Sequence, residues 1–522
     1  MKTMKTRSLF LVVAALAAHA GLTACGTSFM PGADDSKGHA ARPLATVYDF
    51  IVTVPGLSFP QLQATGLTVD LTLVIDSPGA ASGLFEGGVT VHEVKVGGVA
   101  RPFTAASPLP ATGQVMAGDW TLDSFGPIDV GSASTGITSV MLSLGGVLAA
   151  DGRTIDGAAL ATSSGETGAF HAVKQRRYLV AGTDFGVTGT ASLVTVRFNT
   201  IFQVERDLEA ISGDPVARAT GGDIYIVNRF FFDNIQSLDP DAGFTTALQF
   251  STGNGSNPHD VLAVDAGRLY ITRYEPPYND ILIADRADGD FLGSIDLSPF
   301  ADNMSGTPRG DGLVLAEGRV FASLQDIDST FTDYGPGRLA VIDPVTDAVV
   351  DTITTVGRNP LGPPALHPST GKLYYAMAGV FGGSLPRELS GGIEVIDPKS
   401  WTTEGLLVDD DLLGGNVSSV ALAETPAGDT GYCVVTTASG VNVIRAFDPA
   451  TGAIPPGAVY QSTSFLTETI SDGDGYILVP IHDISDPRLL VIDAATGSIV
   501  ATPRLTLPPF SIAVLTRTLG GT

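Results

Sequence analysis

Cysteine, histidine, tryptophan and basic residues are all scarce in this chain of 522 residues, which contains 2 Cys, 7 His, 2 Trp and 29 Lys plus Arg. Two cysteines cannot build the disulfide framework of a small secreted domain. Charged residues make up only 16% of the chain, which excludes a coiled coil and a disordered polyelectrolyte. Because 55 Asp plus Glu give a net charge of −26, the sequence predicts no nucleic-acid partner.

Glycine and proline are abundant instead, with 62 and 33 residues. Turn-forming residues at this density indicate short strands joined by tight turns. The length is comfortable for two or three domains. We therefore expect an all-β protein with more than one domain.

The first 25 residues have the order of an export signal. Basic residues precede the apolar run 9–18, which is shorter than the roughly 20 residues of a membrane-spanning helix. The sequence Leu-Thr-Ala-Cys at 22–25 follows, and it resembles the lipobox of bacterial lipoproteins. This resemblance implies that residues 1–24 are a signal peptide. It also implies that Cys25 is acylated, with palmitate for example, and attaches the chain to a membrane.

The residues after the lipobox predict where the protein resides. Gly26, and not Asp, follows Cys25, which in such lipoproteins implies the outer membrane of the cell envelope. Residues 25–44 are polar with Gly and Pro, so we expect the lipidated Cys and a flexible tether here. An ordinary secretory signal cleaved nearby, with Cys25 unmodified, is the alternative.

A sequence unit recurs seven times from residue 174 onward. In each copy an aromatic residue opens an apolar strand, and these residues are Tyr178, Tyr225, Tyr270, Phe321, Tyr374, Tyr432 and Tyr476. A second strand then ends at a turn whose first residue is Arg197 in the first copy and Asp239, Asp285, Asp343, Asp397, Asp448 and Asp493 in the others. Asp accepts backbone N–H bonds at the start of a turn. We predict a seven-bladed β-propeller with four strands per blade over 174–522.

The two ends of this repeat complement each other. A third apolar strand precedes each aromatic strand, but its last copy, at 510–521, has no aromatic strand after it. The strand at Tyr178 lacks a preceding copy. We therefore expect the C-terminal strand to pair with the strand at Tyr178 and close the ring, leaving no open sheet edge.

The repeat resembles the YVTN-type β-propeller repeats. Tyr225-Ile226-Val227-Asn228 has the strand after which these repeats are named, and 341–346 has their turn. The resemblance implies the fold. It does not imply an activity, because the architecture serves binding, scaffolding and unrelated chemistries.

Residues 45–172 lack the repeat and contain seven strand candidates separated by turns. This spacing predicts a small β-sandwich or an up-and-down barrel that precedes the propeller. The stretch 146–173 resembles the last hairpins of lipocalin-like barrels. We favour the sandwich.

Polar residues gather where the propeller repeat predicts a central channel. Inner strands begin near His259 and Asp260 and near Arg309 and Asp311, and other polar residues occupy loops beside them. The predicted ligand-binding ring consists of Arg229, His259, Asp260, Arg273, Arg309, Asp311 and His482. Convergent polar groups of this kind suit an anionic or sugar-like ligand. The alternative is a water-filled polar channel without a ligand.

The sequence contains no G-x-S-x-G elbow, H-E-x-x-H motif or phosphate loop, so we assign no catalytic residue and no metal ligand. We expect no cofactor. The acidic clusters 285–290, 409–411 and 471–475 lack the twelve-residue calcium loop with its closing Glu, and a structural calcium ion stays the alternative.

These features predict a lipid-anchored envelope propeller that acts as a non-catalytic scaffold for a protein or a small-molecule ligand. The alternative is a lactonase-like or glycosidase-like hydrolase. It would use His259, Asp260, Asp311 and Glu468 at the channel, because acid–base chemistry needs such groups close together.

Overall fold

The computed structural model describes residues 45–78, 84–116, 119–132, 134–149, 152–380 and 390–515. The predicted signal peptide 1–24, the lipidation site Cys25 and the tether up to residue 44 lie outside the described residues. The described chain divides into two compact units. The smaller contains 45–178, 194–203 and 514–515, and the larger contains 179–193 and 204–513.

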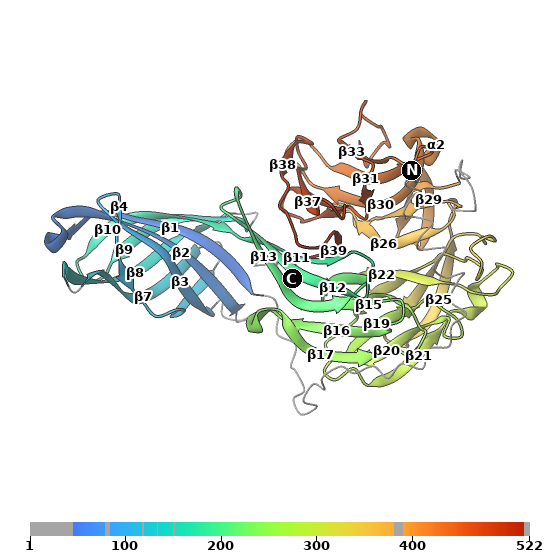
Figure 1. Ribbon diagram of the computed structural model, residues 1–522, viewed down its shortest axis with the longest axis horizontal. Coiled ribbons are helices and arrows are strands. Elements are labelled where there is room, and N and C mark those ends of the chain that lie inside the picture. The colour runs from blue at the N-terminus through green and yellow to red at the C-terminus, as the bar shows by residue number, and fades with distance from the viewer. Residues whose placement is uncertain are drawn as a thin grey trace, which may run out of the picture. The chain divides into compact units, whose positions relative to one another are not determined.

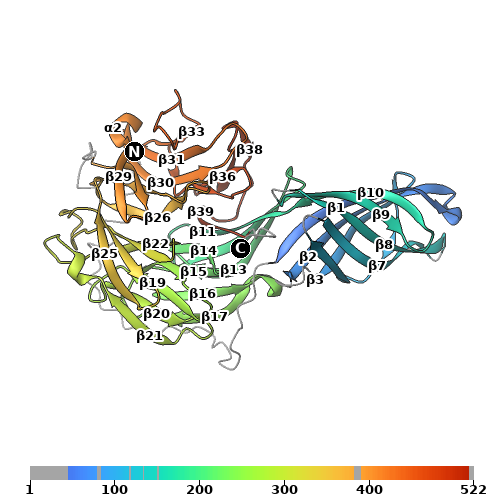
Figure 2. The same ribbon diagram turned by 180° about the vertical axis from the view of Figure 1, so that it is seen from behind.

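The smaller unit is an eight-stranded antiparallel barrel (Figure 2). Its strands are β1 (Thr46–Phe59), β2 (Ala64–Pro78), β3 (Leu84–Val96), β6 (Leu109–Met116), β7 (Asp119–Ser132), β8 (Gly136–Leu148), β9 (Thr154–Ala161) and β10 (Glu166–Lys174). Each strand pairs with the next, and β10 pairs with β1, which closes the sheet. The short strands β4 (Val99–Ala100) and β5 (Phe103–Thr104) pair with β3 and β7. Of the two predicted folds, the barrel is therefore confirmed, and the preference for the sandwich was wrong.

The barrel interior is a packed aromatic core. The ring centroid of Trp120 lies 5.5 Å from that of Phe50, 5.9 Å from Phe85 and 5.8 Å from Phe170. Trp120 and Phe50 are fully buried. Eight strands enclose just enough space for side chains of this size, so the core fills the barrel.

Seven four- or five-stranded sheets are arranged as propeller blades (Figure 1). Six of them lie in the larger unit, and the strands of the first blade belong partly to each unit. From the inner strand outward, blade 1 consists of β39 (Pro509–Val514), β11 (Arg176–Thr183), β12 (Thr188–Arg197) and β13 (Ile201–Ser212). Blade 2 consists of β14 (Pro215–Thr220), β15 (Asp223–Asn228), β16 (Asn234–Asp239) and β17 (Thr245–Ser251). Blade 3 consists of β18 (Pro258–Ala263), β19 (Arg268–Arg273), β20 (Asp280–Asp285) and β21 (Phe291–Asp296). The order places one strand at the channel and three behind it.

Blades 4 to 7 repeat this arrangement. Blade 4 consists of β22 (Gly310–Ala316), β23 (Arg319–Leu324), β24 (Arg338–Asp343) and β25 (Ala348–Thr354), and blade 5 of β26 (Pro360–Leu366), β27 (Leu373–Met377), β28 (Gly392–Asp397) and β29 (Thr402–Asp409). Blade 6 consists of β30 (Gly415–Ala423), β31 (Thr430–Thr437), β32 (Asn442–Phe447) and β33 (Tyr460–Ser462). In blade 7 the short strands β34 (Phe465–Leu466) and β35 (Ile470–Ser471) both pair with β36 (Tyr476–His482), which is followed by β37 (Arg488–Asp493) and β38 (Ile499–Ala501).

Four short helical turns complete the described chain. They are η1 (Pro60–Leu62), η2 (Pro240–Ala242), η3 (Ser298–Phe300) and α2 (Asp410–Leu413). The first belongs to the barrel, and the other three connect propeller strands. The described chain is thus almost entirely β, as its composition predicts.

The ring closes as the sequence predicts. The C-terminal strand β39 pairs with β11 in the first blade, so this blade combines strands from both ends of the repeat region. The backbone N–H of Thr183 donates to the carbonyl of Pro508 at 2.8 Å beside this pairing. Pairing β39 with β11 removes the free edge that β11 would otherwise expose.

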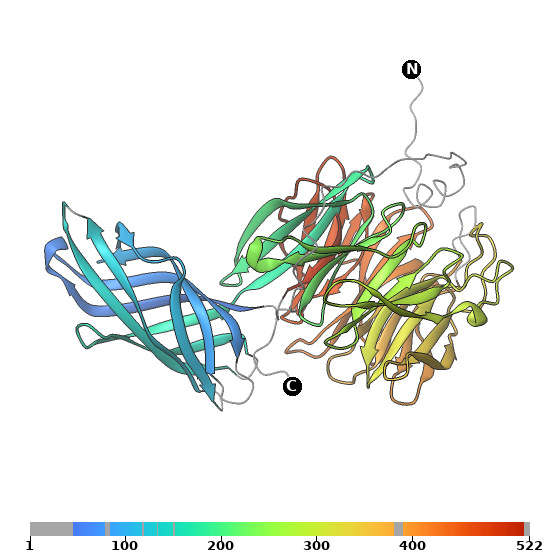
Figure 3. The same ribbon diagram turned by 90° about the horizontal axis from the view of Figure 1, so that it is seen from below.

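Adjacent strands within a blade are antiparallel, so every innermost strand begins at the same end of the propeller. We call this end the entry face. It is formed by the loops that precede each innermost strand and the loops that join the second and third strands of each blade. Figure 3 shows the blades from a direction at right angles to Figure 1.

Candidate functional site

Three blades are joined at the channel by the carboxylate of Asp260 on β18. Arg218 on β14 donates from Nε to Asp260 Oδ1 at 2.6 Å, and the backbone N–H of Leu313 on β22 donates to Oδ2 at 2.8 Å. The Asp260 side chain is only 3% exposed. Burial raises the pKa of Asp260, and Arg218 opposes this shift. Arg218 is not among the predicted ring residues, although its position on the innermost strand β14 is the same signal that identified Asp260.

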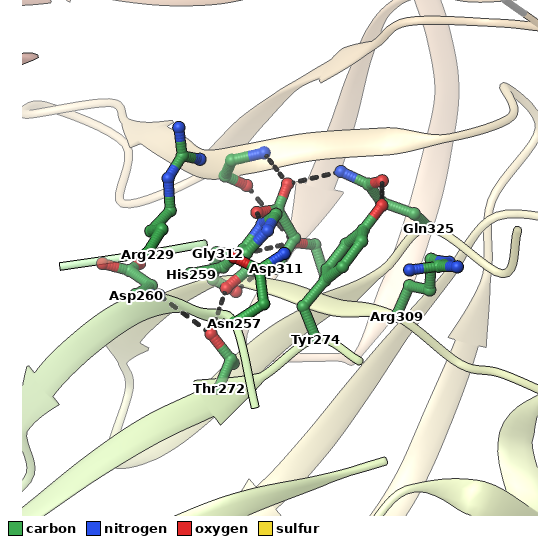
Figure 4. A network of polar contacts seen from close by, with 12 residues as sticks. Arg229, Asn257, His259, Asp260, Thr272, Tyr274, Arg309, Asp311, Gly312 and Gln325 are labelled. Atoms are coloured by element: carbon green, nitrogen blue, oxygen red, sulfur yellow. Dashed lines mark hydrogen bonds and ion pairs between the residues drawn. The ribbon is translucent and has the colours of Figure 1, made fainter. Parts of the chain in front are cut away.

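Beside it, His259 and Asp311 form a second link between blades (Figure 4). The distance from His259 Nδ1 to Asp311 Oδ1 is 2.8 Å. Asp311 Oδ2 accepts from Gln325 Nε2 and from the backbone N–H of Gly362, both at 2.7 Å. Burial alone would raise the pKa of Asp311, but these hydrogen bonds outweigh it and the pKa lies below its ordinary value.

The His259 ring has a fixed orientation. It stacks on Tyr274 with ring centroids 3.8 Å apart and an interplanar angle of 2°. Tyr274 in turn donates from its hydroxyl to Gln325 Oε1 at 2.6 Å. Within the described part of the chain, His259 Nε2 makes no hydrogen bond. A histidine held by a carboxylate through one nitrogen has the second nitrogen available as a proton acceptor or donor.

Arg309 is a buried positive charge between two aromatic rings. Its guanidinium carbon lies 4.7 Å from the ring centroid of Tyr274 and 4.6 Å from that of Phe331. Nη1 donates to Glu275 Oε1 at 2.7 Å, and the side chain is 1% exposed. Such a charge is stable in the interior only because it is paired and stacked.

The two remaining predicted arginines are also paired with carboxylates. Arg273 forms a two-point contact with Asp280, at 2.7 Å from Nε and 2.5 Å from Nη2, and both side chains are 10% exposed. Arg229 Nη2 contacts Asp214 Oδ1 at 2.5 Å. All predicted arginines of the ring therefore have a carboxylate partner within the protein, and an anionic ligand would have to compete with it.

His482 lies in an apolar environment. Its ring centroid is 4.6 Å from Phe185 and 6.2 Å from Phe510, the ring that Arg229 also contacts at 5.4 Å. Burial lowers the pKa of His482, and Nε2 has no hydrogen-bond partner among the described residues. His482 and Arg229 thus share one aromatic neighbour. His259 bonds Asp311, Thr272 bonds both the backbone N–H of Asp260 and the carbonyl of Asp311, and Arg309 stacks on Tyr274 beside them (Figure 4).

Glu468, between β34 and β35, adds a third carboxylate near Arg218. Its Oε1 accepts from the backbone N–H of Ile512 on β39 at 2.6 Å. Burial raises the pKa of Glu468 to about 7, and the charge of Arg218 opposes this shift. The positive charge of Arg218 also interacts with Asp260 and Asp311. Three carboxylates of the predicted hydrolase site, those of Asp260, Asp311 and Glu468, therefore interact with the charge of Arg218, and His259 contacts Asp311.

The acidic clusters act as turns in the described chain. Asp285, Asp409 and Asp472 each accept a backbone N–H two residues later, at 2.8–2.9 Å. No group of three or more His, Cys, Asp or Glu among the described residues is placed to hold a metal ion. In the same residues, no helix has the length and apolarity required to cross a membrane.

Comparisons with known proteins give only remote structural similarities. No family model and no curated protein matches this chain. Among solved structures, hydrazine synthase of Kuenenia stuttgartiensis is 12% identical with a TM-score of 0.42, and the alignment covers 59% of this chain and 88% of the other. The dihydro-heme d1 dehydrogenase NirN is 14% identical with a TM-score of 0.40 and 63% coverage of both chains. AztD of Citrobacter koseri is 12% identical with a TM-score of 0.37, and the alignment covers 65% of this chain and 97% of AztD.

Proposed function

We propose that this chain is a lipid-anchored protein of the bacterial cell envelope whose propeller binds a protein or small-molecule partner without transforming it. The observation that carries this proposal is the pairing of polar side chains between blades. Arg218 contacts Asp260 and His259 contacts Asp311, each pair joining neighbouring blades. Pairs of this kind hold the ring in one shape, and a rigid platform binds with little loss of conformational entropy.

The lipid anchor is supported by the apolar run 9–18 and the lipobox-like sequence at 22–25. A full-length chain expressed in a Gram-negative host with radiolabelled palmitate should carry label and partition with the outer membrane. Cys25→Ser should lose both properties. Cys433 is the only other cysteine and is buried, so Cys433→Ser is a matched control that should keep the label. Label on the Cys25→Ser chain would contradict the anchor.

A hydrolase is the second candidate, and the His259–Asp311 pair favours it. A histidine with Nδ1 on a carboxylate and Nε2 without a partner has the geometry of a general base. The purified full chain should be assayed against lactones and glycosides. Turnover above about 1 s⁻¹ that falls roughly 100-fold in His259→Gln would overturn the binding function. His171→Gln is the control, because His171 forms a similar 2.6 Å contact with Asp156 on the exposed barrel wall.

A further inference from the structure

Six large apolar side chains are exposed on the entry face of the propeller. They are Val187, Phe231, Met304, Val356, Leu412 and Ile484, and their exposed fractions run from 62% to 88%. Each lies in a loop that precedes an innermost strand or joins the second and third strands of a blade. Two other apolar side chains of the described propeller are comparably exposed: Val345, on the opposite face, and Phe291, on the outer strand β21. The entry face is therefore selectively apolar.

Phe231 is exposed at a cost to the fold. Its φ is +72° and that of Phe230 is +21°, a region that bulky residues rarely adopt. Phe231 is 75% exposed although its ring centroid lies 4.1 Å from that of Phe230, so burial of the ring offsets little of the backbone strain. Strain of this kind concentrates at sites that bind or act.

The loop that presents Phe231 is held in place. Asn257 Oδ1 accepts the backbone N–H of Phe230 at 3.0 Å. The buried carboxylate of Asp233 accepts the N–H groups of Gly255 at 2.7 Å and Asn257 at 2.8 Å. An aromatic side chain on a preorganised loop loses little entropy when a partner covers it, which is typical of interface hot spots.

Carboxylates accompany the exposed apolar side chains. Asp184, Asp302, Asp411 and Asp483 lie within three positions of Val187, Met304, Leu412 and Ile484, respectively, and Asp302 is paired with Arg338. Arg229 and Arg358 lie within two positions of Phe231 and Val356, but they are bonded to Asp214 and to the carbonyl of Tyr334. The whole chain has a net charge of −26. An anionic lipid surface would repel this face, whereas lysine and arginine side chains would be attracted to it.

We propose that the entry face docks a basic, amphipathic protein segment. Its apolar side chains would cover Phe231 and others of the six exposed apolar side chains, and its Lys or Arg side chains would lie against the carboxylates that are adjacent to these in the sequence. This inference rests on the proposed binding function and adds to it the surface used and the chemical class of the partner.

The test uses the full chain in detergent and a fluorescent synthetic peptide of Lys and Leu in an amphipathic helical pattern. Anisotropy titrations should show binding that weakens about fivefold or more in Phe231→Ser and stays within about twofold of wild type in Val345→Ser. Met304→Ser should also weaken peptide binding. This second variant still tests the entry face if Phe231→Ser does not fold. Raising the salt concentration should weaken binding to the wild type.

Three results would overturn the inference. One is an equal effect of Phe231→Ser and Val345→Ser on peptide affinity. Another is equal affinity for a peptide with Glu in place of Lys. The third is capture of phosphatidylcholine vesicles through Phe231 without binding of the basic peptide, which would make a lipid surface the occupant. A negative peptide titration would leave the proposed function standing, because that function is tested separately by the labelling of Cys25 and by the turnover assay with His259→Gln.

Discussion

At the scale of single residues, the propeller holds buried charges that are stable only in pairs. Arg273 and Asp280 are both 10% exposed and make a two-point contact. Arg273→Ala would leave the Asp280 carboxylate buried without its partner, and we expect a loss of about 3 kcal/mol in the free energy of unfolding, measured by urea denaturation. The double variant Arg273→Met with Asp280→Leu should recover most of this loss. A loss below about 0.5 kcal/mol in the single variant would show that water replaces the arginine.

Glu468 should make stability depend on pH. Its folded pKa of about 7 lies above the value of roughly 4.3 expected for an unfolded chain. The folded state therefore binds more protons between these values. The stabilising contribution is fully present below about pH 4 and is lost as the pH rises through 7.

Glu468→Gln removes this titration. We expect the unfolding free energy of the variant, relative to wild type, to increase from pH 5 to pH 8, as measured by urea denaturation at both values. Asp483→Asn is a useful comparison, because hydrogen bonds from Ser485 and Ser464 lower the pKa of Asp483 to about 2. Its relative stability should change in the opposite direction only below about pH 4. A pH-independent difference for Glu468→Gln would contradict the assignment.

At the scale of strands and turns, two repeat columns that the sequence shows separately are bonded to each other. The Tyr374 hydroxyl on β27 donates to the carbonyl of Pro449 at 2.7 Å, and Tyr432 on β31 donates to that of Ala494 at 2.8 Å. Each acceptor lies in the Asp turn of the next blade. The Tyr270 hydroxyl likewise donates to Asp347 in the turn of the next blade, whereas the Tyr225 hydroxyl donates to Asp223 of its own blade. At Tyr270, Tyr374 and Tyr432 the aromatic column therefore joins adjacent blades.

Removing one of these hydroxyls should destabilise the ring. Tyr432→Phe leaves the buried carbonyl of Ala494 without its donor, so we expect a loss of about 1–2 kcal/mol in the unfolding free energy. Tyr278→Phe is the matched control, because the Tyr278 hydroxyl bonds the Asn254 carbonyl at an exposed position where water can replace it. Equal thermal stabilities of the two variants would contradict a role in joining blades.

Relieving the strained backbone at Phe231 should stabilise the folded chain, whereas the substitution at Tyr432 should destabilise it. Asn tolerates positive φ better than Phe, so Phe231→Asn should stabilise the folded chain by about 1 kcal/mol, seen as a higher melting temperature. Phe291 is similarly exposed but lies in strand β21, where Asn is unfavourable, and Phe291→Asn should lower the melting temperature. A lower melting temperature for Phe231→Asn would show that the loop needs the Phe ring for folding.

At the scale of the whole molecule, the sequence predicted the propeller better than the barrel. The propeller repeats its strand and turn signals seven times, so weak signals reinforce one another. The barrel has no repeat, and glycines within its long strands, such as Gly157 and Gly168, were indistinguishable from turn residues. In the structure a Cβ at Gly168 would lie 1.8 Å from the carbonyl oxygen of Thr53, so glycine serves close strand packing there.

The candidate site could be predicted only in part. Position on an inner strand identified His259, Asp260 and Asp311. Their partners come from distant sequence: Arg218 precedes Asp260 by 42 residues, and Asp311 follows His259 by 52. Pairings at such separations depend on the packing of one blade against the next, which no local pattern encodes.

Closure of the ring leads to a final prediction. Strand β39 pairs with β11 in blade 1, Ser511 Oγ accepts from Ala217 N in blade 2, and Ile512 N donates to Glu468 beside blade 7. Deleting residues 509–522 should expose the edge of β11 and remove bonds to both neighbouring blades. We expect the shortened full chain to aggregate, measured by size-exclusion chromatography. Co-expressing residues 509–522 as a separate peptide should restore soluble protein, because the open edge is a specific template for that strand. A monomeric shortened chain with an unchanged melting temperature would show that the ring holds together without this strand.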